Sequence, residues 1–383
     1  MKKRYLIALT FVGLVLLGVG AFSLFDFGSK QIIADDATQE QVPLDAESQS
    51  SAVPSALFDF QEVMMNGDSL TLEAASLRSM VSDDTFEGLL LTGDDGSLLM
   101  NPAFVESILE QLDAEAVTFS LTTEGSTCAV RITSDDSTIY GSAGICIVTV
   151  PYENGPLTMA VEDSHGNLIG NSAYFVDGAS LRWQLGTSET YTFSDSAKSF
   201  SDITEHWGKN SIEFLTSHGV LNGMSENTFL PNRSVTRAEF IKMLALMSGE
   251  DYSQCQTNQF HDVAINDWFY SYVAWGTERG LVNGKTENEF FPDATISREE
   301  MAALCDRFIL YFQIDCKAVR SAVDFADAPI IGSWALDSVE RIQAAGIING
   351  KDDNLFDPRG YATRAEAATM LSNLSAYMMA MPH

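Results

Sequence analysis

The chain has 383 residues and a formal net charge of −31 at pH 7, from 22 basic and 53 acidic residues. This length can accommodate more than one domain. So negative a field repels phosphate backbones and anionic lipid, which argues against nucleic acid as a partner.

The N-terminus has the features of an export signal. Three basic residues precede an apolar run over residues 5–25, as in a signal peptide, and small residues near its end favour cleavage after Ser23. The run is also about 20 residues long, enough to span a bilayer if it stays uncut. We therefore expect residues 1–25 to be a signal peptide or, alternatively, a membrane anchor, and in both cases the rest of the chain lies outside the cytoplasmic membrane.

Two segments of different character follow. Residues 26–56 are rich in Asp, Glu, Gln and Ser and have little apolar periodicity, which predicts an acidic disordered linker. Residues 57–198 consist of short apolar runs separated by turn signals, so we expect a β-rich domain of the α+β class. Short helices are predicted over 72–81 and 102–112, the second capped by Asn101.

One pattern then occurs three times. Each copy has Phe-x-Asp, a Trp, Gly-x-x-Asn-Gly, Phe-x-Pro and a T/S-R-x-E tetrad whose Arg lies 30 residues after the Trp. The copies span 199–249, 260–313 and 325–376. A register held at five points indicates three copies of one supersecondary unit.

Each copy is predicted to be a helix, a loop and a second helix. Apolar spacing after the Trp indicates a helix that ends at the first Gly. The tetrad is a capping box at the start of the second helix. The residues expected to cap these helices are Thr236 and Glu239, Ser297 and Glu300, and Thr363 and Glu366.

These motifs resemble those of the S-layer homology family, usually written F-x-D-V, a Trp, G-I-I-x-G, D-G-T-F-x-P and I-T-R-A-E. The resemblance covers residues 200–376 and implies an all-α pseudo-trimer of three helix-loop-helix repeats. It also implies non-covalent anchoring to a secondary cell-wall polysaccharide, often one that bears pyruvate ketals. The partner would then be an anionic, pyruvylated polysaccharide, and the protein would be exported to the cell surface.

The tetrad Arg is the expected anion contact. It occupies the first turn of a helix, where free backbone N–H groups and the helix dipole favour negative charge, and its planar guanidinium can hold a carboxylate. The Trp either packs in the core or covers a sugar face. The expected polysaccharide-binding set is Arg237, Arg298 and Arg364, with Trp207, Trp268 and Trp334, and with Asp202, Asp262 and Asp327.

The copies are unequal. The second has an extra acid, Glu299, which we expect to weaken binding of an anionic polymer. The third has Tyr361 and Ala362 before Thr363, which alters one wall of its expected groove. The groove that contains Arg237 is therefore the first place to expect a ligand.

The cysteines and the potential metal ligands give little information about function. Cys128 and Cys146 flank predicted strands and either form a disulfide or stay free, and pairing of Cys255 with Cys316 in the linkers is left open. No zinc spacing or calcium-binding loop appears in the sequence. We expect no metal and no cofactor.

Signatures of an enzyme are missing from the sequence. It has no Gly-rich phosphate loop and no G-x-S-x-G elbow. We therefore expect a non-enzymatic structural or S-layer-associated surface protein. The alternative is that residues 57–198 are an enzyme or a carbohydrate-binding module that the repeats deliver to the wall.

Overall fold

The structure is a computed structural model that describes residues 60–112, 115–135, 137–139, 143–175 and 178–379. The expected signal or anchor segment and the acidic linker lie outside these residues. Among the residues that it describes, no helix is both long enough and apolar enough to cross a membrane.

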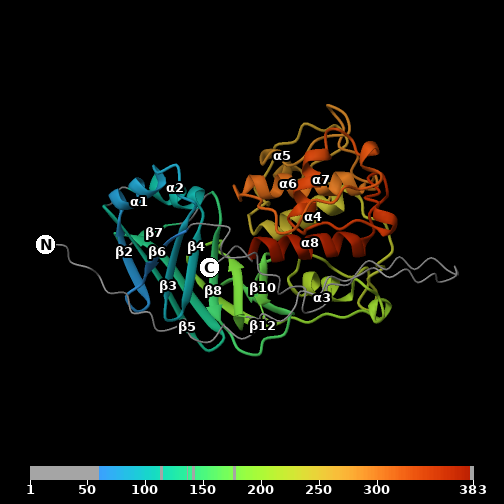
Figure 1. The fold of residues 1–383 in the computed structure, drawn as a ribbon. Coiled ribbons are helices and arrows are strands. Elements are labelled where there is room, and N and C mark those ends of the chain that lie inside the picture. The colour runs from blue at the N-terminus through green and yellow to red at the C-terminus, as the bar shows by residue number, and fades with distance from the viewer. Residues whose placement is uncertain (1–59, 113–114, 136, 140–142, 176–177, 380–383) are drawn as a thin grey trace. The chain divides into compact units, whose positions relative to one another are not determined.

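Two β-sheets make up the N-terminal part of the described chain (Figure 1). One has the strand order β1-β3-β4-β8-β11-β10 and the other the order β2-β5-β6-β12-β9, with β7 paired to β6. All neighbours are antiparallel except β1 and β3. The strands are β1 Gln61–Met64, β2 Ser69–Glu73, β3 Leu89–Gly93, β4 Gly96–Met100, β5 Ala116–Glu124, β6 Thr127–Ser134, β7 Ser137–Thr138, β8 Cys146–Pro151, β9 Met159–Glu162, β10 Ser172–Phe175, β11 Ser180–Gln184 and β12 Thr190–Asp195.

The two sheets share one apolar core. Leu91 and Val148 from the first sheet lie in the same buried cluster as Phe119 and Val130 from the second. Along β6 buried and half-buried residues alternate, which is the pattern of a strand with one face in a core. The β-rich character expected for this segment is confirmed.

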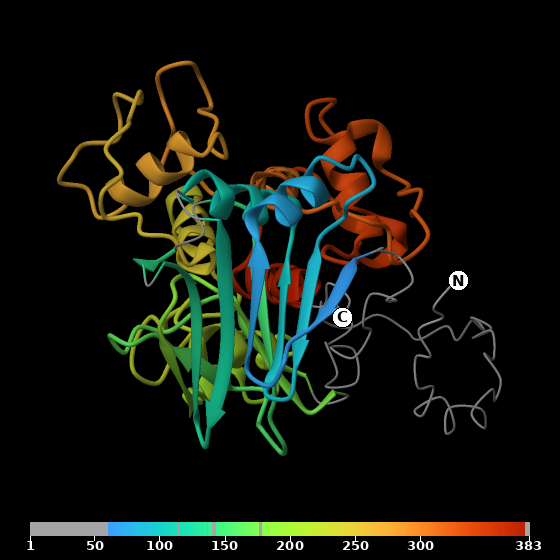
Figure 2. The same ribbon diagram turned by 90° about the vertical axis from the view of Figure 1, so that its left-hand side faces the viewer.

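Two helices lie side by side across one end of these strands (Figure 1 and Figure 2). They are α1 Ala74–Val81 and α2 Pro102–Glu110, close to the predicted ranges. The Asn101 side chain accepts a hydrogen bond from the Phe104 N–H at 3.0 Å, which confirms the predicted cap.

The cysteines are unpaired. Cys128 lies on β6 and Cys146 on β8, in different sheets, and both are buried as free thiols. Burial raises the pKa of Cys128 to about 12. Cys255 and Cys316 are also free, so neither disulfide that the sequence left open is formed.

Three helix pairs form the C-terminal part (Figure 1). Each pair is one copy of the repeated pattern, which confirms the predicted helix-loop-helix unit. The helices are α3 Lys209–Ser217 and α4 Arg237–Ser248, α5 Tyr270–Glu278 and α6 Arg298–Tyr311, and α7 Leu336–Ala344 and α8 Arg364–Met379. Short 3-10 turns lie at Ser201–Ile203, Ala328–Ile330 and Asp352–Asn354.

A ring of backbone hydrogen bonds relates the three repeats to one another. Val235 N–H donates to Ala362 O at 2.9 Å, Ala362 N–H to Ile296 O at 3.1 Å, and Ile296 N–H to Val235 O at 3.0 Å. The ring closes on itself, so each repeat contacts the other two at the residue before its capping box. This places the starts of the three second helices around one centre.

The capping boxes form as predicted. Thr236 accepts from the Glu239 N–H while the Glu239 carboxylate accepts from the Thr236 N–H, and the second repeat does the same. Thr363 and Glu366 repeat the exchange in the third. The glycines that end the first helices have positive φ, namely Gly219, Gly280 and Gly346, a conformation that glycine adopts without strain.

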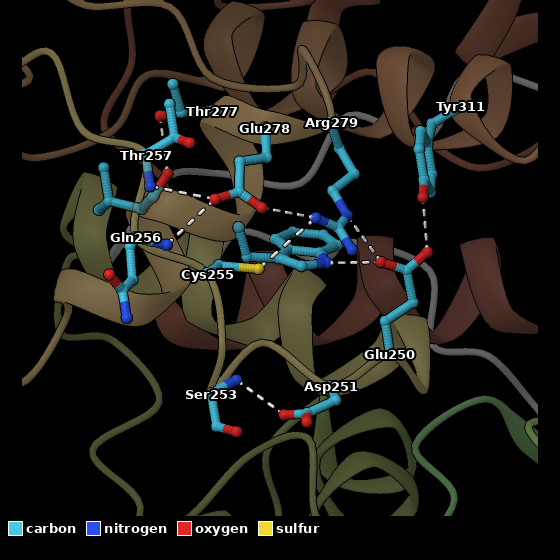
Figure 3. A network of polar contacts seen from close by, with 12 residues as sticks. Glu250, Asp251, Ser253, Cys255, Gln256, Thr257, Thr277, Glu278, Arg279 and Tyr311 are labelled. Atoms are coloured by element: carbon cyan, nitrogen blue, oxygen red, sulfur yellow. Dashed lines mark hydrogen bonds and ion pairs between the residues drawn. The ribbon is translucent and has the colours of Figure 1, made fainter. Parts of the chain in front are cut away.

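A carboxylate network fixes the connection between the first and second repeats (Figure 3). Glu250 accepts hydrogen bonds from Arg279 Nε at 2.8 Å, Trp275 Nε1 at 2.9 Å and the Tyr311 hydroxyl at 2.7 Å. Glu278 accepts from two linker N–H groups beside Cys255. The connector is thereby attached to both helices of the second repeat.

Candidate functional site

Three buried arginines connect neighbouring repeats. Arg237, Arg298 and Arg364 are 6%, 2% and 4% exposed, although each stands in the first turn of its helix. Each guanidinium reaches into the loops of the next repeat around the ring.

The same two acceptors recur in every copy. Nε donates to the carbonyl of the Phe in Phe-x-Pro, and Nη2 donates to the carbonyl of the Asn in Gly-x-x-Asn-Gly. The pairs are Arg237 with Phe290 O at 2.8 Å and Asn283 O at 2.9 Å, Arg298 with Phe356 O and Asn349 O at 2.8 Å each, and Arg364 with Phe229 O at 3.0 Å and Asn222 O at 2.6 Å. The third repeat thus closes onto the first.

The helix starts are not free to bind an anion, and that part of the prediction is wrong. Arg237 N–H donates to Ala294 O, Arg298 N–H to Gly360 O and Arg364 N–H to Arg233 O. The following N–H groups donate to proline carbonyls of the same neighbouring repeats. Packing between repeats therefore satisfies the groups that a helix start ordinarily leaves unpaired. Contact between these three arginines and a sugar stays a prediction.

The charges of the arginines are compensated unequally. Arg237 pairs with Glu300 at 2.8 Å and Arg298 with Glu366 at 3.3 Å. Arg364 has no such partner among the described residues, because the equivalent carboxylate, Glu239, is bound by Arg233. Burial, together with the nearby charge of Arg233, lowers the pKa of Arg364 to about 10.

The aspartates of the Phe-x-Asp motifs bind backbone N–H groups of nearby loops. Each carboxylate accepts from two successive N–H groups of a Phe-x-Pro loop: Asp202 from Phe229 and Leu230, Asp262 from Phe290 and Phe291, and Asp327 from Phe356 and Asp357. The second residue of each loop has positive φ, between 56° and 59°. The carboxylates stabilise a backbone shape that side chains rarely adopt, which is a different role from the sugar contact we expected.

An open pocket lies beside Arg237. It has a volume of about 490 Å³ and takes residues from all three repeats, a size typical of sites for small ligands. We call it groove 1 and define it by Arg237, Asn283, Lys285, Glu299, Glu300, Arg307 and Trp334.

One face of α6 forms a wall of groove 1. Glu300, Ala303, Leu304 and Arg307 all line it, and their spacing of three, four and seven residues places them on one side of a helix. Lys285 Nζ lies 2.5 Å from a Glu300 oxygen. Although burial opposes ionisation, the contacts with Lys285 and the Ser297 N–H hold the pKa of Glu300 below its usual value.

The extra acid of the second repeat has a partner. The Glu299 carboxylate accepts a hydrogen bond from Gly332 N–H at 2.8 Å, two residues before Trp334. Glu299 therefore connects the wall of groove 1 to the segment that carries its aromatic residue. Weaker anion binding because of Glu299 stays a prediction, and the carboxylate positions this segment.

The tryptophans differ in exposure. Trp268 and Trp334 are 56% and 53% exposed, so a core role is wrong for both. Trp207 is half-buried and packs against the core beside His206. Of the three, Trp334 lines groove 1, where its ring is available to an apolar sugar face.

The other two interfaces differ from groove 1 in their side chains. The pocket at Arg298 has a volume of about 20 Å³, and Lys351 there pairs with Asp357 and Glu366. At the Arg364 interface the Lys242 ammonium lies over the Trp268 ring, 5.6 Å from its centroid. That a ligand binds first at Arg237 stays a prediction.

Sequence reasoning missed two residues of groove 1, Lys285 and Arg307. Lys285 directly follows the Gly-x-x-Asn-Gly motif, and Arg307 lies seven residues after the capping Glu300. The spacing from Glu300 was the available signal for Arg307, because it puts both residues on one helix face.

Comparison with known proteins identifies the repeats. Residues 199–241, 259–302 and 324–368 match the family model of the S-layer homology domain. Among relatives, an S-layer protein of Bacillus thuringiensis subsp. finitimus is 28% identical over 177 residues, which are 46% of this chain and 21% of that protein. The predicted resemblance is confirmed.

Other relatives are named as enzymes. An amylopullulanase of Thermoanaerobacterium thermosulfurigenes is 32% identical over 215 residues, 56% of this chain and 11% of that protein. An exoglucanase XynX of Acetivibrio thermocellus is 34% identical over 176 residues, 46% of this chain and 16% of that protein. The chain thus spans less than a quarter of each relative.

These relatives overturn the expectation that the protein is not an enzyme. Proteins named as polysaccharide-cleaving enzymes carry the same repeats, so the repeats do not separate enzymes from structural proteins. The likeness covers the repeat region, and an enzymatic activity in another segment is compatible with it.

Proposed function

Since the chain is a cell-surface protein with three S-layer homology domains, a class that binds cell-wall polysaccharide, we propose that groove 1 is where it docks on an anionic polysaccharide of the wall. The proposal rests on one observation. In a chain of net charge −31, groove 1 is an open pocket that gathers three basic side chains and an exposed Trp.

Local charge supports an anionic ligand. Arg237, Lys285 and Arg307 face two carboxylates, Glu299 and Glu300, around one pocket, so positive charge is in excess there. The rest of the acidic surface repels an anionic polymer at long range. Binding must therefore come from short-range contacts, for which a pocket is better suited than a flat surface because water screens charges less inside it.

The shape of the groove favours a sugar. Trp334 offers an aromatic face to the C–H surface of a ring, while the cations opposite can hold an acid group that the ring carries. A pyruvyl ketal is such a group, since it places one carboxylate on a compact sugar. We propose a pyruvylated polysaccharide as the ligand class.

Sedimentation with cell-wall sacculi tests the docking. The purified chain should pellet with sacculi that retain their polysaccharide and stay soluble with sacculi from which it has been extracted. Equal pelleting with both preparations would contradict the proposal.

A pair of tryptophan variants tests the groove. Trp334→Ala should weaken pelleting by up to about tenfold, which is the order of a lost stacking contact in a binding site. Trp268→Ala is the matched control, because Trp268 is exposed to the same degree but lies outside groove 1. Equal losses for the two variants would remove groove 1 from the proposal.

A further inference from the structure

Arg307 is a cation of groove 1 that forms no ion pair with a described carboxylate. Its Nη1 donates to Leu281 O at 2.9 Å, and within the described chain this is its one hydrogen bond. It forms no ion pair with any described residue. A guanidinium has five N–H donors, so most of the donors of Arg307 are left for a ligand.

The acid next to it in sequence is engaged elsewhere. Asp306 is bound by Arg341 through two hydrogen bonds, of 2.9 Å and 2.6 Å, and by the Ser338 hydroxyl at 2.7 Å. Arg307 itself is half-buried in the pocket wall, and burial lowers its pKa although the charge of Asp306 opposes the shift. A desolvated cation without a partner gains more from an anion than one in water does.

Arg237, the contact expected from the tetrad, is in the opposite situation. Phe290 O, Asn283 O and Glu300 already take one bond from each of its three nitrogens. Burial lowers the pKa of Arg237, the carboxylates of Glu300 and Asp262 oppose that shift, and the charge of Arg307 adds to it. Both guanidinium groups line groove 1, and an anion between two like charges would relieve their repulsion.

We propose that Arg307 is the specificity-determining residue of groove 1, the group that binds the carboxylate of an acidic saccharide. This inference rests on the proposed function and assigns the acid contact to a residue outside the tetrad. Arg237 then acts as a positioning residue, which holds the Phe290 loop and Glu300 in place around the pocket.

The inference also assigns acid recognition to one groove. The position of Arg307 in α6 is taken by Leu246 in α4 and by Asn373 in α8. The small pocket at Arg298 is lined by Asn373, which carries no charge. We therefore expect each chain to bind one acidic saccharide rather than three.

Two small probes and a sacculus assay test the assignment with the full chain. The probes are methyl glucopyranoside carrying a 4,6-linked pyruvyl ketal and the methyl ester of the same compound, which differs by one methyl group and has no charge. Calorimetric titration should give a stoichiometry near one and a preference for the acid. Arg307→Gln should reduce binding of the acid by about tenfold or more and leave binding of the ester unchanged, and Arg307→Lys should retain part of the preference for the acid.

Arg359→Gln is the matched control, because it removes the same charge from an exposed side chain outside groove 1. If Arg307→Gln keeps the preference for the acid, or if Arg359→Gln loses it equally, the assignment to Arg307 is wrong although the anchoring stands. If the unchanged chain fails to pellet with polysaccharide-bearing sacculi, the anchoring itself is wrong. Three bound acids per chain would overturn the restriction to one groove.

Discussion

Because the tetrad arginines bind loops of neighbouring repeats, we expect the same substitution at two equivalent positions to reduce stability by different amounts. Arg298→Met and Arg364→Met both remove a guanidinium that donates to two loop carbonyls. The loss of these hydrogen bonds is common to both variants, so it cancels when their stabilities are compared. The variants differ in the carboxylate left behind.

Arg298→Met leaves Glu366 in the interior without its main partner. The side chains of this pair are 3% and 5% exposed, and removing one member of a buried ion pair costs about 3–5 kcal/mol. Lys351, whose Nζ lies 3.5 Å from the same carboxylate, offsets part of that cost. Arg364→Met leaves no unpaired acid, because Glu239 keeps Arg233.

We therefore expect Arg298→Met to be less stable than Arg364→Met by about 2 kcal/mol or more. For a unit of this size each kcal/mol lowers the melting temperature by about 2–4 °C, so the two should differ by about 4–8 °C. Helix signal followed by circular dichroism during thermal and urea unfolding measures both quantities.

A second substitution isolates the cause. In Arg298→Met combined with Glu366→Gln, the neutral amide needs no counter-charge, and stability should return to near that of Arg364→Met. Equal stabilities for the two single variants, or no recovery in the double variant, would refute the reasoning that the buried charge sets the cost.

Three further outcomes follow from the structure. Asp262→Asn should cost about 1–3 kcal/mol in urea unfolding, because the charged acceptor of two loop N–H groups is lost; a loss no larger than that of an exposed Asp would contradict this. Glu250→Gln should weaken the three contacts shown in Figure 3 and change the near-ultraviolet tryptophan signal, whereas Asp251→Asn should not. Burial lowers the pKa of His218 to about 4, below its ordinary 6.5, so the unfolded chain takes up a proton first as pH falls. About 3 kcal/mol of the free energy of unfolding should therefore be lost between pH 6.5 and pH 4. His218→Gln should flatten the dependence of the free energy of unfolding on pH.

Local sequence patterns predicted the helices of the repeats and their ends. The exchange between Thr236 and Glu239 is made within four residues, and Gly219 ends its helix through its own backbone conformation. Such features depend on neighbours in the chain, so spacing alone is enough to find them. The cap at Asn101 was found for the same reason.

The roles of the tetrad arginines could not be read in that way. The acceptor of Arg364 Nε is Phe229 O, 135 residues earlier, and this contact exists only because the third repeat closes onto the first. Without that closure, an Arg at a helix start looks exposed and ready for an anion. The pattern located the residue correctly but could not show what covers it.

The aspartates illustrate the same limit. Asp202 was grouped with the binding residues because it recurs with the motif, yet recurrence is equally expected of a residue that holds a recurring loop. Only the geometry, two N–H groups around a left-handed Leu230, separates the two explanations.

Groove 1 draws its parts from all three repeats, and this explains why they act as one unit. The first repeat supplies Arg237, the second supplies Lys285 and Arg307, and the third supplies Trp334. Removing any one repeat would also open the backbone ring and leave buried arginines without their acceptors. The repeated residues therefore maintain the closed ring, while under the proposed function the residues that differ between copies determine which groove holds an acid.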